Sequence, residues 1–126
     1  MILDTYGLEF KVVKIGADRS AGVDRKFRTP LNFALTCYFI ENVLNNEYIE
    51  HELIPEMDKA LQGLVYDSDG GGDMTYIEIG SPDSIITTNG VSSAQPLLSY
   101  PIPTQDLKEL LLCWVQFIKA NDINRS

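Results

Sequence analysis

The segment that follows Thr104 constrains the fold most strongly, because its apolar side chains recur at helical spacing. One face of the expected helix carries Leu107, Leu110, Leu111, Trp114, Phe117 and Ile118. Thr104 is the expected N-terminal cap. Leu112, Cys113 and Val115 widen the apolar surface, so this helix is either deeply buried or part of a contact between chains. Burial is the simpler interpretation.

Shorter segments have the patterns of strands. Alternating apolar and charged residues predict a half-buried strand at 8–15. Odd-numbered apolar positions from Leu31 to Phe39 favour a strand over a helix at 31–41. Segments rich in β-forming residues predict three more strands, at 74–79, 85–88 and 97–102, with the turn sequence 81–84 joining the first two into a hairpin.

A second helix is expected from Glu47 to Leu64, capped by Asn45 or Asn46, because its apolar residues lie three and four positions apart. Pro55 lies inside this helix and should kink or split it. Polar residues and two glycines predict a mobile loop at 16–29, which carries basic side chains. The glycine-rich stretch 67–73 and residues 89–95 are further loops.

These elements predict an α+β fold: a mostly antiparallel sheet of about five strands with two main helices packed on it. A chain of 126 residues with 44% hydrophobic residues suits one domain, residues 1–126, with its own core. No run of about 18 apolar residues suggests a membrane span, and the N-terminus lacks a signal-peptide pattern, so we expect a cytoplasmic protein. Cys37 and Cys113 lie in apolar runs, where buried free thiols are favoured over a disulfide.

Charge is distributed unevenly along the chain. The formal net charge is −8, and residues 41–83 contain eleven acidic residues against one base, Lys59. The first 40 residues have a small basic excess, and residues 84–126 are balanced. Such an acidic middle third repels nucleic acid and attracts a basic partner. Solubility alone is the alternative explanation.

The sharpest local motif begins at Asp67. Asp67, Asp69, Gly72 and Glu78 occupy the first, third, sixth and twelfth positions of a calcium-binding EF-hand loop. Gly71 stands where a ligand oxygen is usual, and a strand is expected where the exit helix should begin. An acidic glycine hinge is therefore the favoured interpretation, and a calcium-responsive or small-ligand binding module is the alternative.

No catalytic residue, metal site or cofactor is predicted. His51 is the only histidine and lies among glutamates on the expected helix, where an exposed side chain without a role is the simplest interpretation. The sequence has no nucleophile elbow, phosphate-binding glycine loop or dinucleotide fingerprint. With eighteen acidic residues, a carboxylate-dependent enzyme stays open as a further alternative.

Three features together resemble a known family. They are Leu53-Ile54-Pro55 in the helix expected at 47–64, the glycine turn before Met74, and Ile102-Pro103-Thr104 leading into the final helix with Trp114. Over residues 31–119 this arrangement looks like the small bacterial immunity proteins of contact-dependent growth inhibition and other polymorphic toxin systems. The resemblance implies an intracellular protein that inhibits a cognate toxin, often a basic nuclease, by binding it, without a cofactor.

Charge, and not a motif, selects the expected partner-binding residues. The predicted surface consists of Asp67, Asp69 and Asp73, supported by Glu50 and Glu56, with Tyr66 and Tyr76 supplying amphipathic contact area. The expected partner is a protein toxin domain, and neither nucleic acid nor a membrane. Trp114, Phe33, Phe39 and Phe117 are assigned to the core. The oligomeric state is not predicted.

Overall fold

The computed structural model describes residues 2–43, 45–63, 68–70, 75–88, 98–121 and 123, except for the side chains of Ile15 and residues 68–70. Helices and strands alternate irregularly along the chain. In order they are α1 (Ile2–Thr5), β1 (Leu8–Ile15), β2 (Asp18–Arg25), α2 (Pro30–Glu41), α3 (Asn46–Tyr48), η1 (Ile49–Leu53), α4 (Ile54–Leu61), β3 (Ser68–Gly70), β4 (Thr75–Ile79), β5 (Asp83–Thr88), β6 (Leu98–Pro103) and α5 (Thr104–Ala120).

The strands form two antiparallel sheets, so the α+β class is confirmed and the single sheet of about five strands is wrong. One sheet is the hairpin of β1 and β2, and the other has the order β3-β4-β5-β6. The loop predicted for residues 16–29 is also wrong, because residues 18–25 pair with β1 from Leu8 opposite Arg25 to Ile15 opposite Asp18. Gly16, with φ of 64°, begins the two-residue turn, a position that suits glycine.

The strand predicted for residues 31–41 is helix α2. Its start is fixed by a reciprocal cap in which Thr29 Oγ1 accepts from the Asn32 amide and Thr29 N donates to Asn32 Oδ1, both at 3.1 Å. Pro30 occupies the first turn, where its missing N–H costs nothing. Apolar residues lie on every side of this helix, so the odd-numbered pattern did not distinguish a strand from a helix.

The helix predicted from Glu47 to Leu64 is present, and it runs from Asn46 to Leu61 through α3, η1 and α4. It ends earlier than predicted, because residues 62–63 form a turn, and Leu64 lies outside the described residues. Pro55 does not split it, because η1 is a π turn directly before the proline. There the Ile54 N–H donates to the Ile49 carbonyl, five residues back. This wider turn changes the register where the proline removes a donor.

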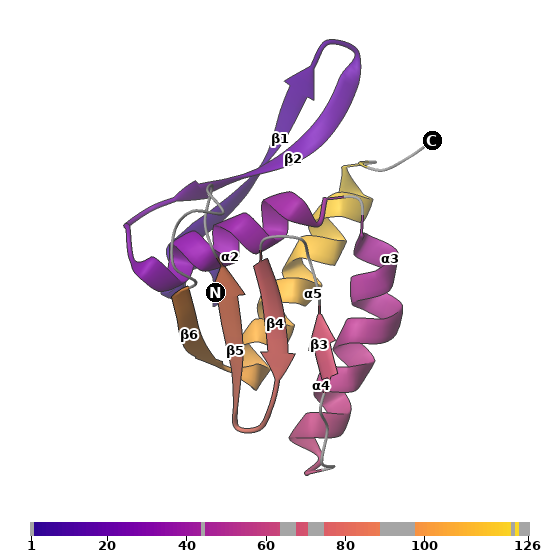
Figure 1. Ribbon diagram of the computed structural model, residues 1–126. Helices are drawn as coiled ribbons and strands as arrows, with labels where there is room; N and C mark the ends of the chain where they lie inside the picture. The colour runs from indigo at the N-terminus through magenta and orange to yellow at the C-terminus, as the bar shows by residue number, and fades with distance from the viewer. Residues whose placement is uncertain are drawn as a thin grey trace.

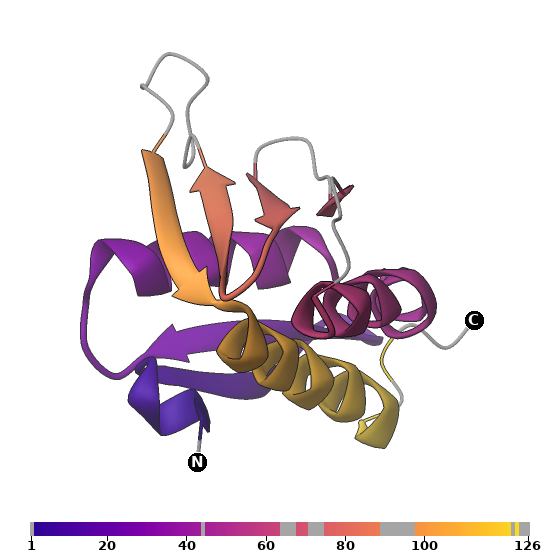
Figure 2. The ribbon, with the colours of Figure 1, turned by 90° about the horizontal axis from the view of Figure 1, so that it is seen from below.

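The larger sheet is covered by helices on one face only. Figure 1 looks onto its other face, and Figure 2 shows α2, α4 and α5 all on the same side of the strands. Ile77, Ile86 and Ile102, which face the helices, are fully buried. The core therefore lies between this sheet and the helical layer.

An aromatic cluster attaches the hairpin to the helices. The Phe10 ring of β1 lies 5.2 Å from Phe39 of α2, 4.9 Å from Trp114 and 5.8 Å from Phe117, both of α5, measured between ring centroids. These edge-on and tilted geometries are the favoured ones for aromatic pairs. Phe39 and Trp114 are fully buried, as predicted, whereas Phe33 and Phe117 are half-buried.

The start of α5 differs from the prediction in one detail. Pro103 holds the N-cap position, and Thr104 is the first helical residue. The Thr104 hydroxyl donates to the Gly80 carbonyl and lies 2.7 Å from Ser84 Oγ, while its amide donates to the Pro82 carbonyl at 2.9 Å. Thr104 thus fastens the helix to the turn between β4 and β5 instead of capping it.

Cys37 and Cys113 are free thiols, as predicted, and both are partly exposed and not buried. Among the helices that the structure describes, none is long and apolar enough to cross a membrane.

Two glycines with similar backbone angles offer a matched test of the junction below the hairpin. Gly7 has φ of 68°, and a methyl group there would lie 2.6 Å from the Phe27 ring, whereas Gly16 has φ of 64° with open space around it. We expect Gly16→Ala to cost about 1 kcal/mol of unfolding free energy, from backbone strain alone. Gly7→Ala should cost more, about 2 kcal/mol, because the half-exposed Phe27 ring must also shift. Urea denaturation measures both, and equal losses would contradict the close packing of Phe27.

Candidate functional site

The structure separates the residues predicted to bind a partner. Tyr66, Asp67 and Asp73 lie outside the described residues. Asp69 belongs to β3, where its backbone is the register partner of Glu78 on β4. Tyr76 is half-buried on β4, and Glu50 and Glu56 lie on the long helix.

Glu50 is already engaged by a distant lysine. Lys119 Nζ, on α5, donates to Glu50 Oε1 at 2.7 Å and also contacts Oε2. This hydrogen bond, more than any other cause, lowers the pKa of the Glu50 carboxyl, and His51 Nε2 lies 3.2 Å from the same group. Glu50 therefore ties η1 to α5.

The carboxylate of Glu56 is also poorly placed to contact a partner. Its Oε2 is buried and has no hydrogen-bond partner among the described residues, and its Oε1 lies 3.9 Å from Lys59 Nζ. Two residues after Glu56, Asp58 Oδ1 lies 2.5 Å from Lys108 Nζ of α5. Three acids of this helix, Glu50, Glu56 and Asp58, thus make contacts within the protein. Its exposed acids are Glu47 and Glu52.

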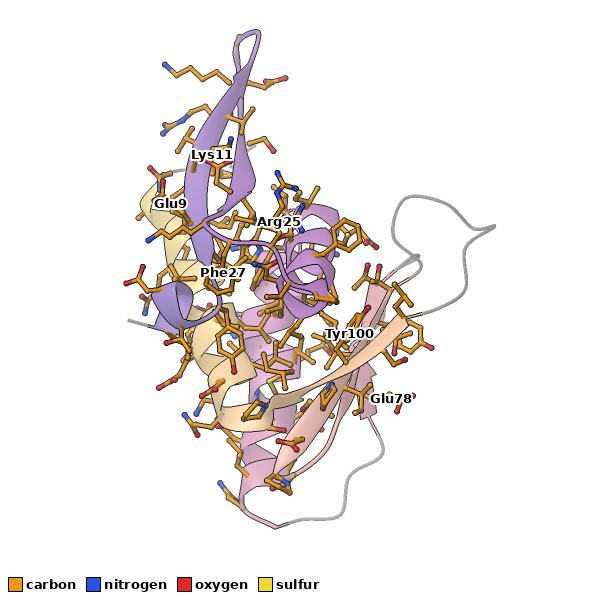
Figure 3. The ribbon with its side chains drawn as sticks, turned by 90° about the vertical axis from the view of Figure 1, so that its left-hand side faces the viewer. Glu9, Lys11, Arg25, Phe27, Glu78 and Tyr100 are labelled. Atoms are coloured by element: carbon orange, nitrogen blue, oxygen red, sulfur yellow. The ribbon has the colours of Figure 1, made fainter. Side chains whose placement is uncertain are left out.

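The face of the larger sheet that points away from the helices brings together a different set of side chains. We call this face the open face. Cross-strand pairing places Tyr76 beside Thr87 and Ser99, Glu78 beside Ile85 and Pro101, and Asp83 beside Pro103. Glu78 and Asp83 are exposed, and Ile85 is half-buried like Tyr76. Figure 3 shows Glu78 pointing away from the helices. No helix that the structure describes covers this face.

The strands of the larger sheet carry acidic residues but no basic ones. Between Lys59 and Lys108 the sequence contains no Lys, Arg or His, but it contains six acidic residues. Within the described part of the chain, neither Glu78 nor Asp83 has an ion-pair partner.

Asp83 also affects a tyrosine behind the sheet. Tyr6 donates to Asp106 Oδ2 at 2.5 Å, and its pKa is raised well above the usual value, mainly by burial and then by this hydrogen bond. Asp83 adds a smaller electrostatic contribution in the same direction. The phenol therefore stays protonated as a donor.

The edge formed by β6 is closed to further strands. Pro101 and Pro103 occupy alternate positions, so their missing N–H groups fall on the side away from β5. An incoming strand would find neither donor. A strand of another chain is therefore not expected to extend this sheet at β6.

A groove of about 490 Å³ lies between α1, β1 and α5. Leu3, Leu8, Phe10, Phe117 and Cys113 give it an apolar lining, and Asp4, Glu9 and Lys26 lie at its charged margin. Burial raises the pKa of the Cys113 thiol, which makes it a poor nucleophile. The groove has the size of a small-ligand site but lacks convergent catalytic groups.

The structure bears on the EF-hand alternative and on His51. Glu78 lies in strand β4 and not in the exit helix that an EF-hand needs. His51 is exposed, as predicted. In the portion of the chain that is described, no group of three His, Cys, Asp or Glu side chains is placed to hold a metal ion.

Sequence reasoning missed Glu78, Asp83 and Ile85 as parts of one face. Two signals pointed to them: the alternation of Tyr76 and Glu78 in a predicted strand, and the absence of bases between Lys59 and Lys108.

Comparison with known proteins gives no match: no family model fits the chain, and neither a curated protein nor a solved structure matches it. Function must therefore be argued from the geometry and charge of this chain.

The Glu50–Lys119 pair predicts a pH-dependent loss of stability in Lys119→Met. The lowered pKa means that the pair stabilises the fold above the unfolded pKa of about 4.3, and that this contribution is lost as pH falls through the folded value. The variant should raise the Glu50 pKa in an NMR titration and be less stable than the parent at pH 7 but not at pH 3. Lys59→Met is the control, and an unchanged Glu50 pKa in Lys119→Met would refute the pairing.

Proposed function

We propose that this protein is an immunity-type inhibitor that acts in the cytoplasm by covering a basic surface of a cognate toxin domain with the open face of its larger sheet. The observation that carries the proposal is the combination of a sheet face that no described helix covers with a segment, residues 60–107, that has six acids and no base. The resemblance to immunity proteins supplies the class of partner. Inhibition would occur by occlusion, without catalysis.

The chemistry of the open face suits a protein better than a nucleic acid. Exposed Glu78 and Asp83 would repel phosphate groups, since no cation lies beside them on the sheet. Half-buried Ile85 supplies apolar contact area between the two carboxylates, and half-buried Tyr76 supplies more on the other side of Glu78. This mixture of a tyrosine, an aliphatic residue and charges at the margin is typical of protein interfaces.

The area of the open face indicates how much of a standard interface other elements would have to supply. Four strands of three to six residues, about 4.8 Å apart and rising about 3.3 Å per residue, cover roughly 300–350 Å². A standard interface buries roughly 800 Å² on each partner. The sheet would therefore supply nearly half of the contact, and elements bordering it would supply the rest.

Electrostatic attraction would act mainly on the rate of association. A face of one charge sign speeds the encounter with an oppositely charged partner, and salt screens this effect. Glu78 and Asp83 are exposed and unpaired in the described chain, so they attract a partner without first breaking an internal ion pair. Glu50, by contrast, would have to leave Lys119.

Charge reversal at Glu78 and Asp83 tests the placement of the interface. We expect Glu78→Lys/Asp83→Lys to slow association with the toxin domain encoded by the neighbouring gene by about tenfold or more at 0.15 M salt and to abolish protection from its toxicity. Glu109→Lys, an exposed position on α5, is the matched control and should retain both. Stopped-flow or surface-binding kinetics and a co-expression survival assay provide the readouts.

Two results would reject parts of this proposal separately. If the double variant binds and protects like the parent, the toxin does not use the open face. If the parent itself neither binds nor neutralises the product of a neighbouring gene, the immunity function is wrong.

A further inference from the structure

The hairpin of β1 and β2 extends beyond the rest of the molecule. Figures 1 and 3 show its turn projecting away from both the helices and the larger sheet. Near its base, Leu8 and Ala21 are buried, and Phe10 joins the aromatic cluster. The tip, residues 14–19, has no such cover, and its described side chains are exposed.

Two cations face each other at this tip. Lys14 is the register partner of Arg19, so both side chains leave the same face of the hairpin. Like charges directly across a strand pair are destabilising. Neither side chain has an acidic partner among the described residues, and both are exposed.

The other cations near the hairpin are mostly engaged. Lys11 Nζ lies 2.8 Å from Asp24 Oδ1, Lys26 Nζ lies 2.6 Å from Asp4 Oδ1, and Arg25 stacks over the Phe33 ring at 5.3 Å. Arg28 is exposed in the segment that joins β2 to α2. Asp18, the one acid of the tip, is the register partner of Ile15 and so leaves the opposite face of the hairpin. Lys14 and Arg19 are thus two cations on one face of the tip with no ion-pair partner among the described residues.

The same chain therefore has a cationic tip and an anionic face that cannot reach each other. The tip projects from one end of the molecule (Figure 1), while the register of the strands puts Glu78 and Asp83 on the open face of the larger sheet. We propose that two copies of this chain associate head to tail, with the tip of one hairpin docked on the open face of the next copy. Lys14 and Arg19 would then contact Glu78 and Asp83.

This contact is heterologous, so each complex leaves one free tip and one free face. Association of that kind continues into short chains unless it closes into a ring. The open face would be shared with the proposed toxin partner, so self-association and partner binding would compete. Self-association itself does not depend on the existence of the partner.

Salt should affect this association in both directions. The net charge of −8 makes whole molecules repel each other, and at 0.01 M salt the screening length of about 30 Å lets that repulsion act. At 0.15 M the length is about 8 Å, so the local attraction of tip and face dominates, and at 1 M it too is screened. Association should therefore be strongest at intermediate salt.

Two charge-reversed variants and their mixture test the proposal by sedimentation velocity. The parent at about 0.15 M salt should form species larger than a monomer as its concentration rises. Lys14→Glu/Arg19→Glu and Glu78→Lys/Asp83→Lys should each be monomeric, with a dissociation constant raised about tenfold or more. An equimolar mixture should associate again, because each variant keeps or gains the complement of the other.

Folding of both variants is checked by circular dichroism and thermal unfolding, since the changed side chains are exposed. A parent that stays monomeric at every salt and concentration overturns the proposal, even if it neutralises a toxin. A parent that associates equally well with the tip reversed, or a mixture that stays monomeric, overturns it as well.

Discussion

The fold depends on the contact of Phe10 with the aromatic rings of α2 and α5. A two-stranded hairpin alone is marginally stable in water, so β1 and β2 need this attachment to remain ordered. Phe10 lies within 6 Å of three ring centroids, and Trp114 among them is fully buried. Because α5 also packs on the larger sheet, with Thr104 fastened to the turn between β4 and β5, the same helix joins both sheets. One consequence is that the helices all lie on one side of the larger sheet and leave its other face open.

Segregation of charge accounts for the remaining features of the surface. The long helix and α5 neutralise each other through Glu50 with Lys119 and Asp58 with Lys108. Lys11 of the hairpin pairs with Asp24, and Lys26, directly after β2, pairs with Asp4. Among the described residues, these internal pairs leave two groups of unpaired charges: the acids of the open face, and Lys14 with Arg19 on one face of the hairpin tip. Exposed pairs add little stability, so their arrangement matters more for what can bind than for the fold.

The sequence predicted α5, β1 and the β4–β5 hairpin, because a long 3.6-residue period and alternation next to a turn are strong local signals. It failed at α2, where apolar residues on all sides leave the period ambiguous and the Thr29–Asn32 cap decides. It also failed at β2, whose inward positions Ala21 and Val23 are too few and small to stand out among polar residues. Glu50 was predicted to face a partner, but Lys119 lies 69 positions away, and such a pairing has no local signal. Composition did identify the middle of the chain as acidic, while only the pairing of strands placed Glu78, Asp83 and Ile85 on one face.

The central claim is that the open face of the larger sheet binds a basic protein. The most direct measurement is an NMR titration of the labelled protein with the toxin domain encoded by the neighbouring gene, at about 0.15 M salt. We predict that the perturbed amides concentrate in β4, β5 and β6, with α5 little changed. Perturbation confined to the groove between α1 and α5, with the sheet unchanged, would contradict the claim.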